Sequence, residues 1–177
     1  MGEVLVRRAT VADVVAIQRL VGQYAERGQM LHRALHQLYE CIRDFHVAFD
    51  GDTLLGCCAL HVDWANLAEG KSLAVGEDCQ RRGVGRRLVE TCLADARALG
   101  IALVYCLTES PEFFRRLGFQ DADRAALPRK VWGECVRCPR FNDCTEVAMT
   151  LQVLAIPTPA PEDPLQSLAA LPRRHVR

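Results

Sequence analysis

The stretch EDCQRRGVGRRLVE, Glu77 to Glu90, places two glycines one residue apart among four arginines, immediately before a run with helical periodicity. Before the first turn of a helix the backbone N–H groups have no partner and carry the positive end of the helix dipole, which favours an anion there. Gly83 and Gly85 lack the β-carbons that would keep a phosphate at a distance. The stretch therefore predicts a phosphate-binding loop between a strand and a helix.

Other interpretations of this loop agree less well with the residues. No Gly-Lys-Ser/Thr follows, as a P-loop requires, and Leu88 stands where a dinucleotide fingerprint has its third glycine. The basic cluster is short, lacks interleaved aromatics, and belongs to a chain with 22 Lys and Arg against 22 Asp and Glu, so we expect no nucleic-acid binding. A solvated basic turn remains the plain alternative.

Hydrophobic periodicity on either side of the loop predicts an α/β domain with a mixed central sheet. A first helix follows the N-cap Thr10, with an apolar face that ends at Tyr24. We expect the chemistry where strands end and helices begin. The further expected elements are a strand over 4–7, a helix over 33–42, a hairpin over 45–64, a strand over 71–75, a helix over 84–99, a strand over 101–108, a short helix from 111 to Gly118, and two closing strands within 131–154.

Length and composition limit the architecture and the compartment. With 177 residues, half of them hydrophobic and a quarter charged, we expect one globular domain over 1–155 with a cysteine-bearing insertion near 133–145. The segment 156–177 carries five of the eight prolines, which favours an irregular tail. The N-terminus lacks signal-peptide features, no apolar run could span a bilayer, and the nine cysteines are odd in number. We expect a cytoplasmic protein with free thiols and no membrane partner.

Two motifs identify a family resemblance. Gln80 to Gly85, Gln-Arg-Arg-Gly-Val-Gly, resembles the acetyl-CoA pyrophosphate loop of the GNAT N-acetyltransferase superfamily, and ESPEFFRRLGF, Glu109 to Phe119, is similar to its late motif. The resemblance implies a mixed, mostly antiparallel sheet flanked by helices, with acetyl-CoA as co-substrate. The cofactor-binding residues that it implies are Leu73, Ala74, Val75, Gln80, Arg81, Arg82, Gly83, Val84, Gly85, Arg86, Phe113, Phe114 and Arg116.

The late motif departs from the superfamily at one position. Many members carry a tyrosine that protonates the leaving thiolate, where this chain has Phe114. Another group or water must then supply the proton. Ser110 matches a family serine that assists near the thioester, although a serine before Pro111 is also the expected N-cap of a short helix.

Longer segments resemble short bacterial N-acetylglutamate synthases. They include LHRALHQLYE, GCCALHVDWANLAEGKSLAV and LPRKVWGECVRCPRFNDCTEVAM, and the likeness runs from Val6 to Leu154. It implies acetyl transfer from acetyl-CoA to the α-amine of L-glutamate, the first step of arginine biosynthesis. Longer relatives carry an amino-acid-kinase-like domain that senses arginine, and we expect no arginine feedback through such a domain here.

A glutamate acceptor sets requirements for the site. Its two carboxylates need cations, and Arg33 and Lys71 are the candidates, with a solvated helix residue and an exposed strand-end charge as their alternatives. The protonated amine needs a base, and Glu69 matches the position where the family places such a carboxylate, with a solvated loop carboxylate as the alternative. A backbone N–H near Ala74 or Val75 would meet the oxyanion, and attack would be direct.

The insertion carries a second candidate site. Cys135 and Cys138 have the two-residue gap of a metal clip, and Cys144 lies six residues further on. No nearby histidine supplies a fourth ligand, so free or redox-active thiols are the alternative to zinc. Acyl transfer needs no metal, and we predict none at the reaction centre.

Two competing functions remain open at this point. One is an acetyltransferase for another small amine, which would need a different pocket around Arg33 and Lys71. The other is a non-catalytic acyl-CoA-binding or redox-sensing protein, favoured by Phe114 and the cysteines. Glu69 and the two cations favour the enzyme. A homodimer is one assembly that such a chain could form.

Overall fold

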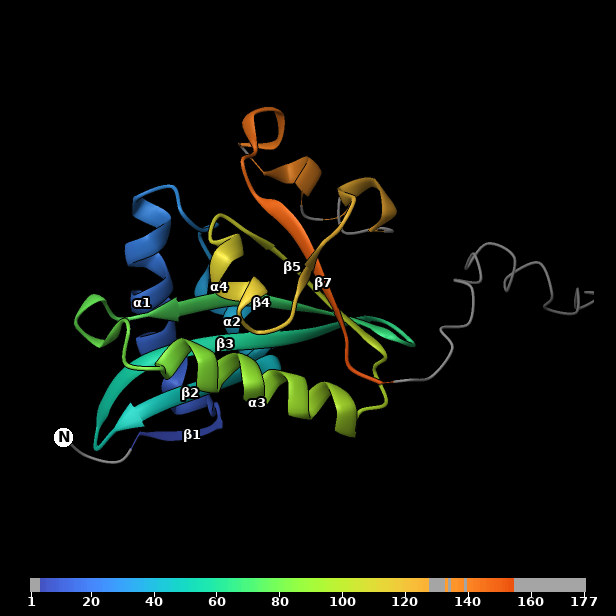
Figure 1. Cartoon of the computed structure of the whole chain (residues 1–177). Coiled ribbons are helices and arrows are strands. Elements are labelled where there is room, and N and C mark those ends of the chain that lie inside the picture. The colour runs from blue at the N-terminus through green and yellow to red at the C-terminus, as the bar shows by residue number, and fades with distance from the viewer. Residues whose placement is uncertain (1–3, 128–132, 134, 139, 155–177) are drawn as a thin grey trace, which may run out of the picture.

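The structure, a computed structural model, describes residues 4–127, 133, 135–138 and 140–154. Seven strands form one sheet in the order β1-β2-β3-β4-β5-β7-β6 (Figure 1). Every neighbouring pair is antiparallel except β4 and β5, so the predicted mixed, mostly antiparallel sheet is confirmed. The strands are β1 (Leu5–Arg8), β2 (Phe45–Asp50), β3 (Thr53–Trp64), β4 (Leu67–Val75), β5 (Leu103–Thr108), β6 (Gln120–Asp121) and β7 (Val147–Gln152).

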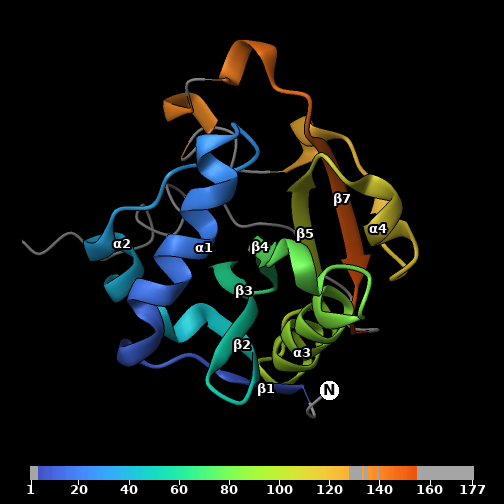
Figure 2. The ribbon, with the colours of Figure 1, turned by 90° about the vertical axis from the view of Figure 1, so that its left-hand side faces the viewer.

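Helices cover both faces of the sheet, α1 and α2 on one face and α3 and α4 on the other (Figure 2). The helices are α1 (Val14–Glu26), α2 (Leu35–Glu40), α3 (Val84–Ala98) and α4 (Pro111–Arg115). Short 3-10 turns are η1 (Val11–Asp13), η2 (Ile42–Asp44), η3 (Glu77–Cys79), η4 (Arg124–Ala126), η5 (Cys135–Arg137) and η6 (Phe141–Asp143). Among the described residues no helix is both long enough and apolar enough to cross a membrane.

Each face of the sheet has its own core. Under α1 and α2, apolar side chains at helical spacing, such as Val14, Ile17 and Val21, pack on the small residues Cys57 and Ala59 of β3. Under α3, the buried face of the helix packs on the opposite side of the same strands. Two cores separated by one sheet are the layer arrangement that the sequence pattern predicts.

The first helix begins with a salt-bridged turn. Arg7 donates to both carboxylate oxygens of Asp13, at 2.7 and 3.0 Å, and the backbone N–H of Thr10 donates to the same carboxylate at 2.7 Å. The predicted start after Thr10 is confirmed, although the first turn is the 3-10 helix η1. This turn fixes the direction in which α1 leaves β1.

Strand β4 is longer than the sequence predicts and is interrupted by a β-bulge. Opposite β3, Cys57 pairs with Ala74 and Ala59 with Lys71, so Ser72 and Leu73 share the single place opposite Cys58. Ser72 adopts a left-handed conformation, φ +52°. The polar residues before 71 interrupt the apolar pattern, which is why only 71–75 was predicted as a strand.

The parallel pairing of β4 and β5 is short. It joins Leu67–Glu69 to Leu103–Tyr105, and beyond Glu69 the two strands separate. The opening lies at the carboxyl ends of both strands, where α3 and α4 begin. This is the position predicted for the chemistry.

The closing strands differ from the prediction. The structure pairs β7 with β5 and with the two-residue β6, which precedes the insertion rather than starting near 131. Residues 128–132, where the expected strand begins, lie outside the described residues, as does the predicted tail over 156–177. The short helix α4 ends at Arg115, and a turn carries the chain to Gly118, φ +93°.

Candidate active site

A cavity of about 790 Å³ opens where β4 and β5 separate. Its walls come from the end of α1 and the segment after it, from β4, from the glycine-arginine loop, from the start of α4 and from the cysteine insertion. Segments far apart in the chain thus contribute to one volume, large enough for an elongated ligand.

The predicted phosphate loop lies at one end of this cavity. Gln80, Arg81, Gly83, Gly85 and Arg86 line it, at the N-terminus of the 15-residue helix α3. A β-carbon on Gly85 would meet the Phe113 ring at 3.4 Å and Val75 at 3.5 Å, so the glycine leaves space above the first turn. The arrangement predicted from the sequence, strand, loop and helix N-terminus, is present.

The residues expected to bind the cofactor differ in whether their side chains reach the cavity. Leu73, Val75, Phe113, Phe114 and Arg116 line the cavity together with the loop residues. The side chains of Ala74 and Val84 are buried in the cores. At these two positions only the backbone could face a ligand. Arg82 is exposed and does not line the cavity.

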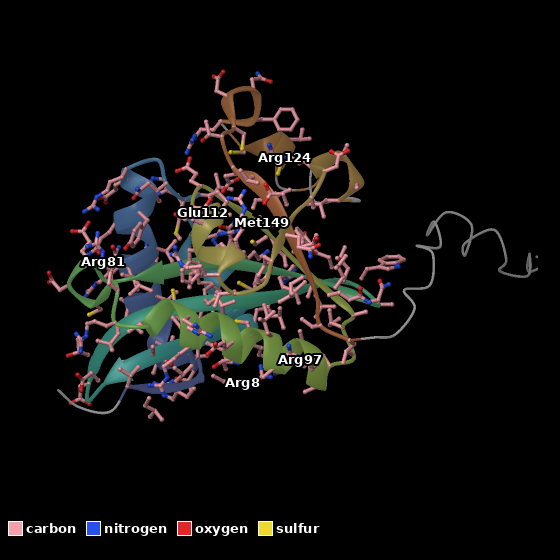
Figure 3. All side chains as sticks on the ribbon, viewed as in Figure 1. Arg8, Arg81, Arg97, Glu112, Arg124 and Met149 are labelled. Atoms are coloured by element: carbon pink, nitrogen blue, oxygen red, sulfur yellow. The ribbon has the colours of Figure 1, made fainter. Side chains whose placement is uncertain are left out.

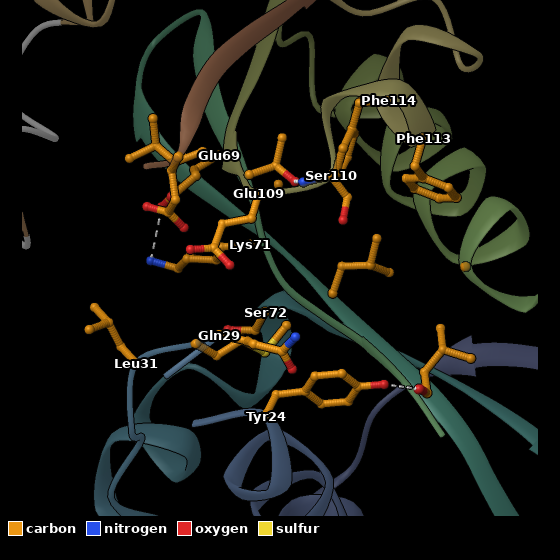
Figure 4. Close-up of a pocket in the computed structure, with 18 of the residues that line it drawn as sticks. Tyr24, Gln29, Leu31, Glu69, Lys71, Ser72, Glu109, Ser110, Phe113 and Phe114 are labelled. Carbon is orange, nitrogen blue, oxygen red and sulfur yellow. Dashed lines mark hydrogen bonds and ion pairs between the residues drawn. The ribbon is translucent and has the colours of Figure 1, made fainter. Parts of the chain in front are cut away.

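Tyr24 is a cavity residue that the sequence pattern did not single out. Its hydroxyl donates to the carbonyl oxygen of Val75 and accepts from Nε2 of Gln80 at 3.0 Å. Figure 4 shows the ring reaching across from α1 toward β4. The sequence placed Tyr24 on the apolar face of the first helix, and a tyrosine in the last turn of such a face was the available signal, because its hydroxyl needs a partner.

The predicted base is buried inside β4. Glu69 is 4% exposed, and its Oε2 lies 3.4 Å from Nζ of Lys71, whose side chain is 12% exposed. The alternatives of a solvated loop carboxylate and an exposed strand-end charge are therefore wrong. Both residues face the α1–α2 side of the sheet, because Glu69 pairs with His61 and Lys71 with Ala59 of β3. The pair lies where β4 leaves β5 (Figure 4).

Arg33 reaches the same cavity from the segment between α1 and α2. It is half-buried and precedes α2, which begins at Leu35 rather than at 33 as the sequence predicts. The structure thus brings Arg33, Glu69 and Lys71 to one cavity, although 36 positions separate Arg33 from Glu69 in the sequence. Sequence spacing alone could not establish this.

Ser110 and Phe114 lie on the wall across the opening from β4 (Figure 4). The Ser110 hydroxyl makes no capping bond to α4, and the backbone N–H of Ser110 donates to Oγ1 of Thr108 at 2.9 Å. Phe114 is buried and packs edge to face on Phe113 and Phe119, with ring centroids 5.1 and 5.3 Å away. A side chain without a titratable proton therefore lines the cavity at this point.

The insertion is tied across the cavity by Arg140. Its guanidinium donates to Oε1 of Glu109 at 2.6 Å and to the carbonyl oxygen of Gly28, in the segment after α1. Thr145 donates to the same Glu109 oxygen at 2.9 Å. The hydrogen bond from Arg140 holds the pKa of the Glu109 carboxyl below its usual range. The Arg140 side chain thus joins the insertion to the segment after α1 and to the segment before α4.

Two cysteines of the insertion, Cys135 and Cys144, lie against Arg124, which is labelled in Figure 3. In the described part of the chain, no cluster of three His, Cys, Asp or Glu is arranged to hold a metal ion. Instead, Nη2 of Arg124 lies 3.1 Å from Sγ of Cys144 and 3.8 Å from Sγ of Cys135. The described residues therefore place a guanidinium against two of the three thiols of the insertion.

Sequence comparisons agree with this geometry. Residues 42–121 match the model of the acetyltransferase (GNAT) domain. The chain is 40% identical over 144 residues to the uncharacterized N-acetyltransferase CT2212 of Chlorobaculum tepidum, covering 81% of this chain and 93% of that protein. It is 38% identical over 136 residues to an amino-acid acetyltransferase of Mycobacterium tuberculosis, covering 75% and 78% of the two chains.

Solved structures share the fold. Rv2747 from Mycobacterium tuberculosis, solved with CoA, superposes with a TM-score of 0.72 at 34% identity, covering 85% of this chain and 99% of that one. The N-acetylglutamate synthase of Neisseria gonorrhoeae, solved with coenzyme A and N-acetyl-glutamate, gives a TM-score of 0.77 at 28% identity. There the match covers 87% of this chain but 36% of the longer synthase chain.

Proposed function

The chain belongs to the GNAT acetyltransferase family, and we propose that it transfers the acetyl group of acetyl-CoA to the α-amine of L-glutamate, the step that begins arginine biosynthesis. Relatives named amino-acid acetyltransferase support an amino-acid acceptor. The gonococcal synthase solved with N-acetyl-glutamate supports glutamate in particular.

The proposal assigns each part of acetyl-CoA to a different part of the cavity. The pyrophosphate would lie on the backbone N–H groups at the start of α3, with Arg81 and Arg86 beside it. The amide-containing arm would run through the opening between β4 and β5, where the edge of β4 at Leu73 and Val75 faces no strand. Backbone groups of a strand edge bond amides as a neighbouring strand would.

The acceptor would bind at the other end of the cavity. Arg33 and Lys71 supply cationic groups for its two carboxylates. Nζ of Lys71 lies 3.4 Å from Oε2 of Glu69, so one cation of the acceptor end is next to the proposed base. An ionised carboxylate can accept the proton that the α-ammonium must lose, directly or through water.

The reaction then needs no acyl-enzyme. The neutral amine attacks the thioester carbonyl carbon, and a backbone N–H near Ala74 or Val75 stabilises the oxyanion. The carbon–sulfur bond breaks as the nitrogen loses its second proton. The CoA thiolate takes up a proton from water or through Ser110, whose hydroxyl is reprotonated in the same relay, because Phe114 has none to give. The products are N-acetylglutamate and CoA.

The observation that carries this proposal is the buried pair of Glu69 and Lys71 on β4, beside the separation of β4 and β5. Burying two charges is costly, and such pairs are concentrated at functional sites.

The proposal is tested by following CoA release from acetyl-CoA with glutamate, glutamine, aspartate, other amino acids and a polyamine. We expect glutamate to give the highest kcat/KM. Equal rates with glutamine or with a polyamine would contradict the glutamate acceptor and leave the acetyltransferase assignment intact. Acetyl-CoA binding without turnover on any acceptor would contradict catalysis by this chain.

A further inference from the structure

The insertion contains a cluster that acetyl transfer does not use. Arg124 contacts the sulfur atoms of Cys135 and Cys144 through the same nitrogen, Nη2, and its buried Nε has no hydrogen-bond partner among the described residues. A guanidinium that contacts sulfur in place of carboxylate stabilises whichever sulfur carries a negative charge.

A carboxylate stands on the other side of Cys144. Its Sγ donates to Oε2 of Glu146 at 3.6 Å, while Nη2 of Arg124 lies 3.1 Å from the same sulfur. The thiol proton therefore has an acceptor, and the thiolate that it leaves has a cation. This is the arrangement that makes a cysteine nucleophilic.

The two sulfurs contact the same guanidinium nitrogen. Because each lies within 4 Å of one nitrogen, their separation cannot exceed about 7 Å, the sum of the two contacts. Cys144 is half-buried and lines the cavity, whereas Cys135 is 7% exposed. A small solute can reach Cys144 first.

Two cysteines of the core, Cys57 and Cys106, have a different environment from Cys144. Burial raises the pKa of the Cys57 thiol and of the Cys106 thiol to about 12. These thiols stay protonated, behave as small apolar groups and have no guanidinium beside them. Hydrogen bonds with Cys58 and His46 lower the pKa of the Cys92 thiol to about 6, but this residue is only 2% exposed. Sγ of Cys79 lies 4.0 Å from Nη1 of Arg82, farther than Cys144 lies from Arg124. We therefore expect oxidation to be fastest at Cys144.

We propose that Cys144 is a peroxide-sensitive thiol and that Cys135 resolves its oxidised form to a disulfide. The Cys144 thiolate attacks one oxygen of a hydroperoxide, the O–O bond breaks, and the alkoxide leaves with the proton held by Glu146. Sulfur is thereby oxidised to the sulfenic acid. The Cys135 thiol then attacks this sulfur, the S–O bond breaks, and water departs with the Cys135 proton.

The net reaction converts two thiols and a hydroperoxide into a disulfide, an alcohol and water. It requires no metal and no step of acetyl transfer. The site therefore stands independently of the acceptor proposed above. Since Arg124 and both cysteines line the same cavity as Glu69, oxidation would alter the wall next to the acceptor end.

Peptide mapping tests the proposal directly. The reduced full chain is treated with hydrogen peroxide, alkylated, and cut with trypsin without reductant. Trypsin cuts after Arg140, between the two cysteines, so a disulfide joins two peptides that otherwise separate. We expect a Cys135–Cys144 linkage that dithiothreitol removes, with Cys57 and Cys106 recovered as thiols after denaturation.

Variants test the roles of the neighbours. Arg124→Gln should slow Cys144 oxidation roughly tenfold or more, because it removes the charge-assisted contact to the thiolate. Glu146→Gln should slow it by a similar factor, because it removes the group that returns a proton to the leaving alkoxide. Cys135→Ser should stop at the sulfenic acid, which dimedone labels, and Cys57→Ser is the matched control. A linkage from Cys138, an unchanged rate in Arg124→Gln, or oxidation of Cys144 no faster than Cys106 would overturn the proposal.

Discussion

Glu69 shows how a single side chain depends on its strand. It is buried at the last residue where β4 still pairs with β5, and Lys71 is its ion-pair partner. The sequence predicted a strand over 71–75 only, with Glu69 just before it, because a strand buried on both faces usually presents an unbroken apolar run. The burial of Glu69 could only follow from the fold.

Replacing Glu69 by Gln should reduce kcat by roughly 10²- to 10⁴-fold, the usual contribution of a general base. The KM for acetyl-CoA should change little, because Glu69 lies at the other end of the cavity from the loop. Steady-state CoA release measures both constants. Glu112→Gln, on the exposed face of α4, is the control, and equal kcat values in the two variants would remove Glu69 from the proton transfer.

Arg33→Ala should raise the KM for glutamate by about 10- to 100-fold, the loss of one charge-assisted contact. Binding of acetyl-CoA, followed by calorimetry, should stay the same, because Arg33 comes from the α1–α2 segment and not from the loop. The matched control is Arg19→Ala on the exposed side of α1. An unchanged glutamate KM would exclude Arg33 from the acceptor site.

Asp13 provides a prediction about stability. The hydrogen bond from Arg7 lowers the pKa of this carboxyl to about 2, and 7% of the residue is exposed. A carboxyl whose pKa is lower in the folded state stabilises the fold above its unfolded pKa and loses that contribution as the pH falls through the folded value. The contribution of about 2 kcal/mol should therefore disappear between about pH 4 and pH 2.

Asp13→Asn should lower the free energy of unfolding by about 2 kcal/mol at pH 7, with a much smaller difference near pH 2. Urea unfolding at both pH values measures it. Asp121→Asn serves as the control, since its ion pair with Arg115 is more exposed and should contribute little. A difference between wild type and Asp13→Asn that is the same at both pH values would contradict the assignment.

At the scale of elements, α3 and its loop are the part that the sequence predicts well. Hydrophobic periodicity predicts the helix, and Gly83 and Gly85 mark where it begins. Gly100, which adopts φ +78°, follows its end. The β4 bulge could not be predicted, because Ser72 has no preference for the left-handed conformation that it adopts. Nor could the contacts of Tyr24, whose partners are Val75 in β4, 51 positions away, and Gln80 in the loop, 56 positions away.

A glycine in that loop can serve either a left-handed backbone conformation or the close approach of a ligand. Gly85→Ala tests the second role. The added β-carbon would make ordinary contacts with Phe113 and Val75, and Gly85 has no positive φ, so the melting temperature should not fall. The same methyl group would occupy space next to the proposed pyrophosphate. We expect the Kd for acetyl-CoA to rise roughly tenfold or more, about 1.4 kcal/mol.

Gly83 should respond to substitution in the opposite way, with an effect on stability instead of on binding. Gly83 has φ +80°, so Gly83→Ala should lower the melting temperature through backbone strain, although its β-carbon would meet no atom within 4 Å. Acetyl-CoA titration and thermal unfolding distinguish the two variants. An unchanged Kd in Gly85→Ala would place the phosphates elsewhere.

At the scale of the whole molecule, the insertion becomes part of the site only through long-range contacts. Arg140 bonds the segment after α1 and the residue before Ser110, which are 112 and 31 positions away. The sequence indicated an insertion with cysteines but could not indicate where it would lie. Its contacts cross the cavity rather than extend the sheet.

Arg140→Ala should release these contacts. We expect faster hydrogen exchange over 140–146 and a glutamate KM raised about tenfold, with acetyl-CoA affinity unchanged. Arg97→Ala, exposed in the last turn of α3, is the control. Exchange equal to that of the wild type would show that the insertion is held by other contacts.

The brief pairing of β4 with β5 has a mechanical consequence. The sheet consists of two half-sheets, β1 to β4 and β5 to β6, joined along a parallel seam of three residue pairs. If the proposed function is right, the amide-containing arm of acetyl-CoA would lie between β4 and β5 beyond Glu69, where the two strands no longer pair, and would take the place of a strand there. Bound acetyl-CoA would then stabilise the contact between the two half-sheets. The protein with acetyl-CoA should therefore unfold in one cooperative transition, even under conditions in which the two half-sheets of the free protein separate first.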